Sequence, residues 1–473
     1  MKISFEYGVG TVEAELPDHS EVFIPGETVK DPPVLDNISE ATRQSILNPI
    51  GLEPISKQVR KGSKVVIVFP DKVKGGFQPN SHRKVSIPII LEECLKAGVD
   101  KKDIKLICSN GLHRKNTPDE IKSLLGEAVF KEYFWSGQIT NHDSEDYDNL
   151  IDLGTDEMGS PVIMNKEAHD ADLTVLIGHT LGNPYGGYSG GYKHCSTGIT
   201  HWRSIGAHHN PHVMHGDDFV PVSGKSLMRS KFDSIGQHME KSMGKKFFCC
   251  DAVLDTFQRQ IAIFSGAASE IQPLSWEVAD KRTYVKWAEK KYNVMIFGMP
   301  QAFHYGDGMG TNPLLMMQAI SAQIIRHKRI LSDHPVIICA SVCDGFFHDE
   351  EFPSYREIYE LFQKGYSNVL PDIEKHGEYI CSKQEYIDKY RFGYGYHPFH
   401  GFSMISCAHI AEKHASAIYI TGAREPGLAR SMGMKTRASI EEALKDSVKY
   451  TGKQNILALP KAFKCAAVHL CEK

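Results

Sequence analysis

Seven short runs of β-branched and aliphatic residues recur along the chain, and each ends in polar or turn-forming residues. Runs of this length are typical of strands buried on both faces, as in parallel sheets. Segments with helical patterns lie between them, and Thr117-Pro118-Asp119-Glu120 has the residues of a helix start with a capping box. Strands that alternate with helices predict an α/β fold with parallel-type sheets flanked by helices. The runs are 64–69, 104–108, 173–177, 294–297, 336–340, 417–421 and 456–459.

The length of the chain and one charged segment bear on its domain organisation. A chain of 473 residues is too long for one compact core, so we expect two domains. The charged segment 280–291 precedes the predicted strand at 294–297, and it predicts a boundary between residues 1–280 and residues 281–473. Because polar residues follow predicted strands in both halves, we expect the active site in the cleft between the two domains.

Composition excludes several classes of partner. The net charge of −4 provides no basic surface for nucleic acid. No apolar run approaches the length needed to span a bilayer, and the first residues lack a signal-peptide pattern. The eleven cysteines are odd in number and scattered, which favours reduced thiols in a cytoplasmic protein. We therefore expect a cytoplasmic protein that binds neither nucleic acid nor membrane, and its oligomeric state is left open.

Polar residues follow four of the predicted strands. Asp71 and Lys74 follow the first run and His113 follows the second. His179 and a glycine-rich loop follow the third, and His304 follows the run at 294–297. In parallel α/β sheets, ligands bind beyond the carboxyl ends of the strands. A histidine there can be a catalytic base or a helix cap, and an aspartate–lysine pair can be an exposed ion pair, but four such strand ends together favour a site.

The glycine-rich loop 183–194 contains Ser189 and Lys193, and His209 follows Lys193 by sixteen residues. Glycines allow a backbone to approach a ligand closely, and serine with free N–H groups can hold a phosphate. A lysine can pair with that phosphate or become a covalent attachment point, and a histidine can bind a metal. The loop matches neither dinucleotide nor Walker patterns. It predicts a phosphorylated cofactor tethered beside a metal, with a purely structural turn as the alternative.

Taken in order along the chain, these residues resemble the nickel-dependent lactate racemase family. The resemblance runs through most of the chain and is densest between about residues 65 and 210. The Ser-Gly-Gly-x-Lys block with a histidine sixteen residues later is its most specific part. It rests on Asp71, Gly111-Leu112-His113-Arg114, Asn141-His142-Asp143, Gly187-Tyr188-Ser189-Gly190-Gly191-x-Lys193, Gly198-Ile199 and His209.

The resemblance implies a nickel-pincer nucleotide, a pyridinium ring whose two sulfur arms and one ring carbon bind nickel. Lys193 would carry this cofactor covalently, and His209 would supply the remaining nickel ligand. Ser189, Gly190 and Gly191 would contact the cofactor. Cofactor-synthesis proteins would then be partners of this chain.

The resemblance also implies an isomerase, a racemase or epimerase of a 2-hydroxy acid that works by reversible hydride transfer to the cofactor. His113 would be one of two acid/base histidines and would remove the hydroxyl proton. Residues 1–280 would bind the cofactor and carry the catalytic groups, and residues 281–473 would close over the substrate.

Three positions depart from the family pattern. Asn183 occupies the place of the second catalytic histidine, and an amide is no base at neutral pH. Lys74 replaces the arginine that grips the lactate carboxylate. Gln318 is retained, whereas Ser321 replaces a lysine. With Asp71, Lys74, Gln318 and Ser321 as substrate-binding residues, we expect a 2-hydroxy acid larger or more polar than lactate, such as a sugar acid.

The missing base leaves two hypotheses for the catalytic pair. Either His113 acts alone beside Asn183, or another histidine replaces the missing one. The candidates are His179, His201, His208 and His304.

Two other functions remain open at this point. One is a metal-dependent hydrolase that uses His113, His208 and His209, although no zinc-binding helix motif supports it. The other is a non-catalytic protein that binds the nickel-pincer nucleotide.

Overall fold

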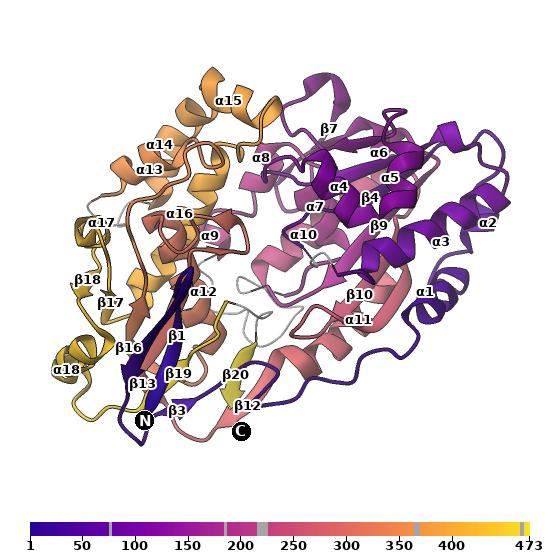
Figure 1. Ribbon diagram of the computed structural model, residues 1–473. Helices are drawn as coiled ribbons and strands as arrows, with labels where there is room; N and C mark the ends of the chain where they lie inside the picture. Colours follow the sequence, from indigo (N-terminus) through magenta and orange to yellow (C-terminus); the bar gives the residue numbers. More distant parts are fainter. Residues whose placement is uncertain (75–77, 184–186, 215–225, 364–368, 464–467) are drawn as a thin grey trace.

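The structure is a computed structural model, and it describes all residues except 75–77, 184–186, 215–225, 364–368 and 464–467. It has two large β-sheets, each flanked by helices (Figure 1). All seven predicted strands are present, and so is the predicted α/β fold class. Pro184, Tyr185 and Gly186 of the glycine-rich loop lie outside the described residues.

The first sheet has six strands in the order β11-β10-β9-β4-β5-β6. Its neighbours are parallel except for the antiparallel pair β10 and β11. Every residue of β4, β9 and β10 is buried, as expected for strands covered on both faces. The strands are β4 (Val65–Pro70), β5 (Ile104–Ser109), β6 (Ile139–Asn141), β9 (Leu173–Thr180), β10 (Phe248–Leu254) and β11 (Gln260–Ala267).

Alternate side chains of these strands enter two separate cores, because successive residues of a strand point to opposite faces. Val65 and Ile67 pack in the core with α1 (Ile38–Leu47), α3 (His82–Lys96) and α4 (Pro118–Leu125). Val66 and Val68 pack in the other core, with α7 (Tyr192–Gly198), α10 (Leu227–Met243) and α11 (Ala268–Thr283). The predicted capping box is confirmed at the start of α4, where Thr117 and Glu120 bond to each other's backbone N–H.

The second sheet has eight strands, and the path β18-β17-β16-β13-β1-β2 runs through it, with β19 paired to β13 and β3. The first strand of the chain, β1 (Lys2–Gly8), is parallel to β13 (Tyr292–Pro300). The indigo N-terminal strands therefore lie among the strands of the second half (Figure 1). The remaining strands are β2 (Gly10–Glu15), β3 (Glu21–Val22), β16 (Leu331–Ala340), β17 (Ala417–Thr421), β18 (Lys435–Arg437) and β19 (Ile456–Leu459).

This pairing bears on the predicted domain boundary. Residues 1–22 belong to the sheet of the second half, so a division at residue 280 cannot be a simple cut of the chain. The charged segment 280–291 forms the end of α11 and the strand β12 (Tyr284–Ala288), which pairs with β20 (His469–Glu472). The assignment of separate roles to residues 1–280 and 281–473 stays a prediction.

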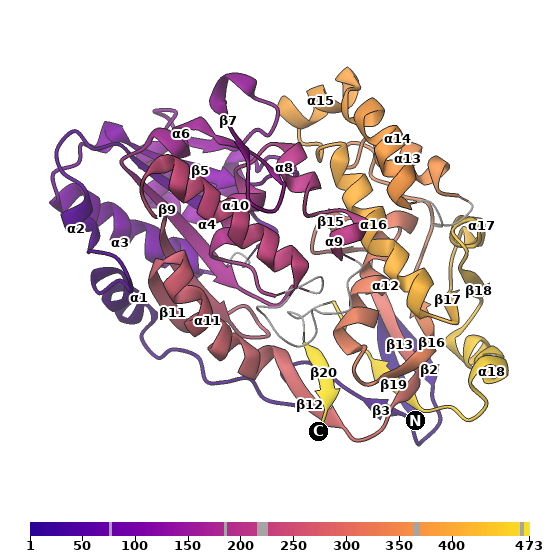
Figure 2. The ribbon, with the colours of Figure 1, turned by 180° about the vertical axis from the view of Figure 1, so that it is seen from behind.

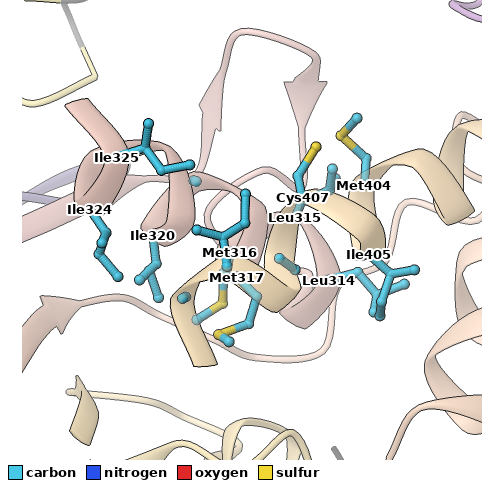
Figure 3. Close-up of a cluster of buried hydrophobic side chains, with 14 of the residues drawn as sticks. Leu314, Leu315, Met316, Met317, Ile320, Ile324, Ile325, Met404, Ile405 and Cys407 are labelled. Carbon is cyan, nitrogen blue, oxygen red and sulfur yellow. The ribbon is translucent and has the colours of Figure 1, made fainter. Parts of the chain in front are cut away.

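Two long helices, α12 (Pro313–His327) and α16 (Phe399–His414), pack against each other beside the second sheet (Figure 2). Both are almost entirely buried. Figure 3 shows the apolar side chains at their contact, among them Met316, Met317 and Ile320 of α12 and Ile405 of α16. The pair is therefore a rigid wall that lies between the second sheet and the first.

Contacts between distant segments join the two halves above this wall. The Tyr390 hydroxyl donates to the carbonyl of Gly111 at 2.8 Å. The buried His397 ring bonds to the Glu145 carboxylate at 2.8 Å, and the His397 amide donates to the carbonyl of Leu112. These bonds hold the segment before α16 against the loop that carries His113.

The smaller elements complete the fold. Among the described residues, no helix is long and apolar enough to cross a bilayer. The ten described cysteines are buried free thiols. The remaining elements are α2 (Ile55–Gln58), α5 (Glu127–Tyr133), α6 (Lys166–Asp170), α8 (Trp202–Gly206), α9 (Pro211–Met214), α13 (Tyr355–Leu361), α14 (Val369–Cys381), α15 (Gln384–Arg391), α17 (Pro426–Ser431), α18 (Ile440–Thr451), β7 (Leu150–Thr155), β8 (Pro161–Asn165), β14 (Ala302–Phe303) and β15 (Gly306–Asp307), with short 3-10 turns at 101–103 and 147–149.

Candidate active site

A cavity of about 480 Å³ lies between the carboxyl ends of β4, β5 and β9 on one side and α12 and α16 on the other. This is the cleft that the sequence predicts, and its volume is within the range of about 300–1,000 Å³ usual for ligand sites. Residues from the two halves of the chain meet in it. The predicted site residues that line it are Asp71, Lys74, His113, Asn183, Ser189, Gly190, Lys193, His209 and Gln318.

His113 is held by a carboxylate. Its Nδ1 lies 2.6 Å from Oδ2 of Asp71, which is 2% exposed. A carboxylate only accepts, so Nδ1 carries the proton of this bond and Nε2 is left facing the cavity. Burial alone would raise the pKa of Asp71, but the charge and hydrogen bond of His113, with Lys74 and Arg83, lower it below its ordinary value. Asp71 therefore stays ionised and orients the imidazole.

The buried Arg83 guanidinium holds the loop that follows β4. Its Nη1 donates to the carbonyls of Pro70 and Asp71 at 2.9 Å, and also to that of Lys74. Arg83 comes from α3 and is fully buried. Burial lowers its pKa to about 10, so the side chain remains charged at neutral pH. It thereby positions both predicted substrate-binding residues of this loop.

Lys193 is the second residue of α7 and is half-buried in the cavity wall. Its Nζ lies 5.3 Å from the centre of the Phe232 ring. Burial, helped by the charges of Lys74 and Arg229, lowers the pKa of Lys193 well below its ordinary value. A lowered pKa makes the amine easier to deprotonate, and the deprotonated amine is the nucleophile that a covalent attachment requires.

His209 and His208 form a pair with a defined hydrogen-bond order. Nε2 of His208 lies 3.2 Å from the carbonyl of Ser196, which can only accept, so this nitrogen carries the proton. Nδ1 of His208 then accepts from Nδ1 of His209 at 2.6 Å. This leaves Nε2 of His209 without a proton and available to a metal. Burial and the neighbouring His208 and Lys193 lower the pKa of His209 well below its ordinary value, which keeps the ring neutral.

The glycine loop is shaped by a buried carboxylate. The Gly191 amide donates to Oδ2 of Asp251 at 2.8 Å, and Asp251 is 1% exposed. A Cβ at Gly190 would lie 2.5 Å from the same oxygen, so no larger residue fits there. Gly191 does not line the cavity, and its amide is already used. The Ser189 hydroxyl donates to the His179 carbonyl at 2.5 Å. Ser189 and Gly191 therefore stabilise the conformation of the loop through bonds to the protein itself.

The positions on α12 divide into two groups. Gln318 lines the cavity and is followed at helical spacing by Ala322 and Arg326, which line it as well. Ser321 points elsewhere, because its hydroxyl donates to the carbonyl of Ala408 at 2.9 Å and accepts from the amide of Ala411 at 3.0 Å. The expected substrate contact of Ser321 is therefore a bond between α12 and α16. Arg326 is a cationic residue of the cavity that was not predicted from the sequence.

The four candidate replacement histidines are in different surroundings. His179 and His304 line the cavity, whereas His201 and His208 do not. His201 caps α8 and bonds to Tyr147, so its ring is occupied. His400 of α16 lines the cavity and was not considered from sequence. In the sequence, the feature that could have indicated His400 is a histidine followed by glycine in His397-Pro398-Phe399-His400-Gly401.

Asn183 also lines the cavity, at the position where the family pattern has a histidine. Its side-chain Nδ2 lies 3.6 Å from the sulfur of Met228, and its backbone N–H donates to the carbonyl of Gly187. An amide side chain here can bond to a ligand but cannot carry a proton to it.

The fold and this cavity define an α/β protein with two parallel-type sheets and a ligand site at strand ends, built around an oriented histidine and a buried lysine. Residues 7–219 match the family model of the lactate racemase N-terminal domain. The chain is therefore similar to lactate racemases, most clearly over residues 7–219.

Two curated relatives are similar over part of their length. A lactate racemase of Lactiplantibacillus plantarum is 25% identical over 269 residues, which cover 56% of this chain and 59% of the relative. A lactate racemase of Thermoanaerobacterium thermosaccharolyticum is 27% identical over 207 residues, 44% of this chain and 46% of the relative. The chain thus spans about half the length of the curated relatives it matches.

Two solved structures share the fold. The lactate racemase apoprotein from Thermoanaerobacterium thermosaccharolyticum superposes with a TM-score of 0.73 and 19% identity, covering 99% of both chains. A structural genomics target from Thermotoga maritima has a TM-score of 0.56 and 13% identity, covering 91% of this chain and 98% of that one. At these identities the likeness concerns the fold.

Proposed function

We propose that this protein is a racemase or epimerase of a 2-hydroxy acid that works with a nickel-pincer nucleotide bound covalently to Lys193. The observation that carries the proposal is the meeting of His113, Lys193 and His209 in one cavity. Lys193 would carry the cofactor, His209 would bind the nickel, and His113 would transfer the proton. The substrate would be a small molecule, and cofactor-synthesis proteins would act on Lys193.

The residues present fit this cofactor. Lys193 offers an amine of lowered pKa for the covalent bond, and His209 offers Nε2 as a soft-metal ligand because its Nδ1 is bonded to His208. When bound, the nickel-pincer nucleotide would supply the acceptor and donor of hydride at the α-carbon. The cavity would exclude water from this chemistry, since α12 and α16 cover the strand ends.

The proton chemistry belongs to His113. Nε2 takes the proton of the substrate hydroxyl as the α-carbon is oxidised, and it returns the proton to the 2-keto oxygen when the centre is reduced again. Asp71 keeps the ring in the tautomer with a bare Nε2 and stabilises the imidazolium that forms. Lys74, on the same loop as Asp71, would face the substrate carboxylate.

The cavity supports a substrate larger than lactate. Asp71 is the one carboxylate among the described lining residues, against Lys72, Lys74 and Arg326. Arg326 lies eight residues after Gln318 on α12, or about 12 Å along the helix. Polar groups spaced along the wall in this way suit a longer acid with several hydroxyls, such as a sugar acid.

The metal-dependent hydrolase has less support. His208 has both ring nitrogens in hydrogen bonds and does not line the cavity. Among the residues that the structure describes, no three histidine, cysteine or acidic side chains gather as a metal-binding group. A non-catalytic protein that binds the nickel-pincer nucleotide would differ from the proposed enzyme only in turnover.

The test is intact mass and nickel content of protein made in a host that synthesises the pincer cofactor, with peptide mapping of Lys193. A mononucleotide-sized adduct on Lys193 with about one nickel per chain is expected. Conversion of one epimer of a sugar acid to the other then separates the enzyme from a binding protein. An unmodified Lys193 with another metal at the histidines contradicts the proposal.

A further inference from the structure

His400 faces the cavity from the half of the structure opposite His113. It lies on the buried helix α16 and is 3% exposed. The centres of the two imidazole rings are 5.5 Å apart, and the ring planes are nearly perpendicular at 84°. Both residues line the same cavity, His113 after a strand of the first sheet and His400 on the helix wall.

The two histidines are held in the same way. Nδ1 of His113 is bonded to Asp71, and Nδ1 of His400 lies 2.7 Å from the hydroxyl of Tyr355, which is 1% exposed. Within the described part of the chain, Nε2 of His400 has no hydrogen-bond partner although it is buried. A buried ring nitrogen without a partner costs free energy unless a ligand or water completes it. We therefore expect a polar group of the bound ligand to form a hydrogen bond with this nitrogen.

Two other histidines of the cavity, His179 and His304, are not held in this way. Both ring nitrogens of His179 lack a partner among the described residues, so no bond selects one of them. The ring of His304 has no hydrogen bond there either, and its residue is exposed in a two-residue hairpin turn at φ 38°. Of these three, His400 alone has one ring nitrogen bonded and the other buried without a partner among the described residues.

We infer that His400 is the second proton-transfer residue of this site, in place of the histidine that Asn183 has replaced. The inference rests on the proposed function. For one epimer, the hydroxyl proton goes to Nε2 of His113, and for the other it goes to Nε2 of His400. In each case the O–H and C–H bonds break, the C=O bond forms, and the α-hydrogen leaves with its electron pair to the hydride acceptor named above. When hydride returns to the opposite face, the other histidine gives its proton to the 2-keto oxygen.

Tyr355 suits this role because a hydroxyl can donate or accept. When Nε2 of His400 is bare, Nδ1–H donates to the Tyr355 oxygen. When His400 is protonated, the same bond stays. Burial and the charge of His113 lower the pKa of His400 well below its ordinary value, so a protonated His400 gives up its proton readily. Tyr355 is thus a positioning residue, and His400 is the group that touches substrate.

The experiment compares single-turnover oxidation of D-gluconate and of D-mannonate, which differ only at the α-carbon, by rapid quench. Wild-type holoenzyme and the variants His400→Gln, His113→Gln and His409→Gln are used, each checked for the Lys193 adduct and nickel. We expect His400→Gln to slow the oxidation of one epimer by about 10²- to 10⁴-fold and to leave the rate for the other epimer unchanged. His113→Gln should show the opposite preference. His409, on the same helix but outside the cavity lining, is the matched control.

The outcomes separate the two proposals. Unchanged rates for both epimers in His400→Gln, with an active wild type, would overturn the assignment of His400, and so would an equal loss for both. A wild type that carries the adduct and oxidises neither acid would overturn the proposed function, and the role of His400 with it. Tyr355→Phe should weaken the same half-reaction as His400→Gln by a smaller factor and shift its pH profile.

A second readout needs no cofactor. In cofactor-free protein labelled with [¹⁵N]histidine, the ring signals of His400 are those absent from His400→Gln. Addition of D-gluconate should shift its Nε2 signal, while Tyr355→Phe should shift its Nδ1 signal before any ligand is added. An Nε2 signal that does not respond to D-gluconate at saturating concentration contradicts contact between His400 and the substrate.

Discussion

The two walls of the cavity are built on different principles. The strand-end wall consists of Asp71, His113, Lys193 and the residues around them, on loops that follow β4, β5 and β9. The helix wall consists of the cavity-facing residues of α12 and α16, among them Gln318, Arg326 and His400. Residues of the first wall come in short consecutive stretches such as 70–74, whereas those of the second recur along each helix at helical spacing.

The two walls also differ in their similarity to the family model. The family model covers residues 7–219, which contain the strand-end wall but not α12 or α16. On α12, Ser321 stands where the family pattern has a lysine, and its hydroxyl bonds to α16. Under the proposed function, the strand-end wall would carry the proton and cofactor chemistry, and the helix wall would adapt the site to its substrate.

The largest effect is expected for Lys193→Ala. Removal of the amine leaves no atom for the covalent bond, so the adduct should be absent from the intact mass and activity should fall below detection. Lys193→Arg, which keeps a long basic side chain but lacks the nucleophilic amine, should behave in the same way. An active, adduct-free variant would break the assignment of chemistry to the strand-end wall.

Asp71→Asn should lower kcat by about 10²- to 10⁴-fold while the adduct remains. An asparagine can present its NH₂ group to Nδ1 and so favour the tautomer with a protonated Nε2. The decrease should appear in kcat more than in KM. Steady-state kinetics on adduct-containing protein measures it, and an unchanged kcat would contradict the orienting role of Asp71.

The pH dependence of stability tests the loop of the strand-end wall. Burial alone would raise the pKa of Glu120, but its bonds to Arg114 and the Thr117 amide lower it to about 2, from 4.5. A lowered carboxyl pKa stabilises the fold above pH 4.5, and this contribution is lost as the pH falls toward 2. It amounts to about 3 kcal/mol at most.

Urea unfolding of wild type and Glu120→Gln between pH 3 and pH 7, pH values chosen around this window, should show it. The difference in the free energy of unfolding should be largest at pH 7 and should shrink as the pH falls. A difference independent of pH would show that packing, and not the ion pair with Arg114, holds this loop.

Ser321→Ala should lower the free energy of unfolding by about 1–3 kcal/mol, because the Ala411 amide loses its acceptor between two buried helices. KM and kcat should hardly change. Thermal unfolding and steady-state kinetics separate these effects. A large rise in KM with unchanged stability would instead return Ser321 to the substrate site.

Gln318→Ala is the matched substitution three residues away, and it should raise KM by about tenfold, the loss of one hydrogen bond to the substrate of about 1.4 kcal/mol. Its effect on stability should be smaller than that of Ser321→Ala, since Gln318 faces the cavity. Equal effects of both variants on KM would remove the distinction between cavity face and packing face on α12.

Much of the strand-end wall followed from local sequence. The buried runs such as 64–69 and 173–177 became β4 and β9, and the capping box at Thr117 formed as predicted. Strand ends of a parallel sheet meet at one edge, so residues that follow them come together whatever the loops do in detail. This is why Asp71, His113 and Lys193 could be expected in one site.

The remaining features depended on the tertiary structure. Which sheet receives β1 is decided by pairing with β13, almost 300 residues away, and no local pattern encodes that choice. The rotation of α12 about its axis places Gln318 in the cavity and Ser321 against α16. His400 lies next to His113 only because α16 packs over the strand ends. Short-range periodicity determines which residues are buried in a strand or helix, whereas the partners of a buried face are set by long-range packing.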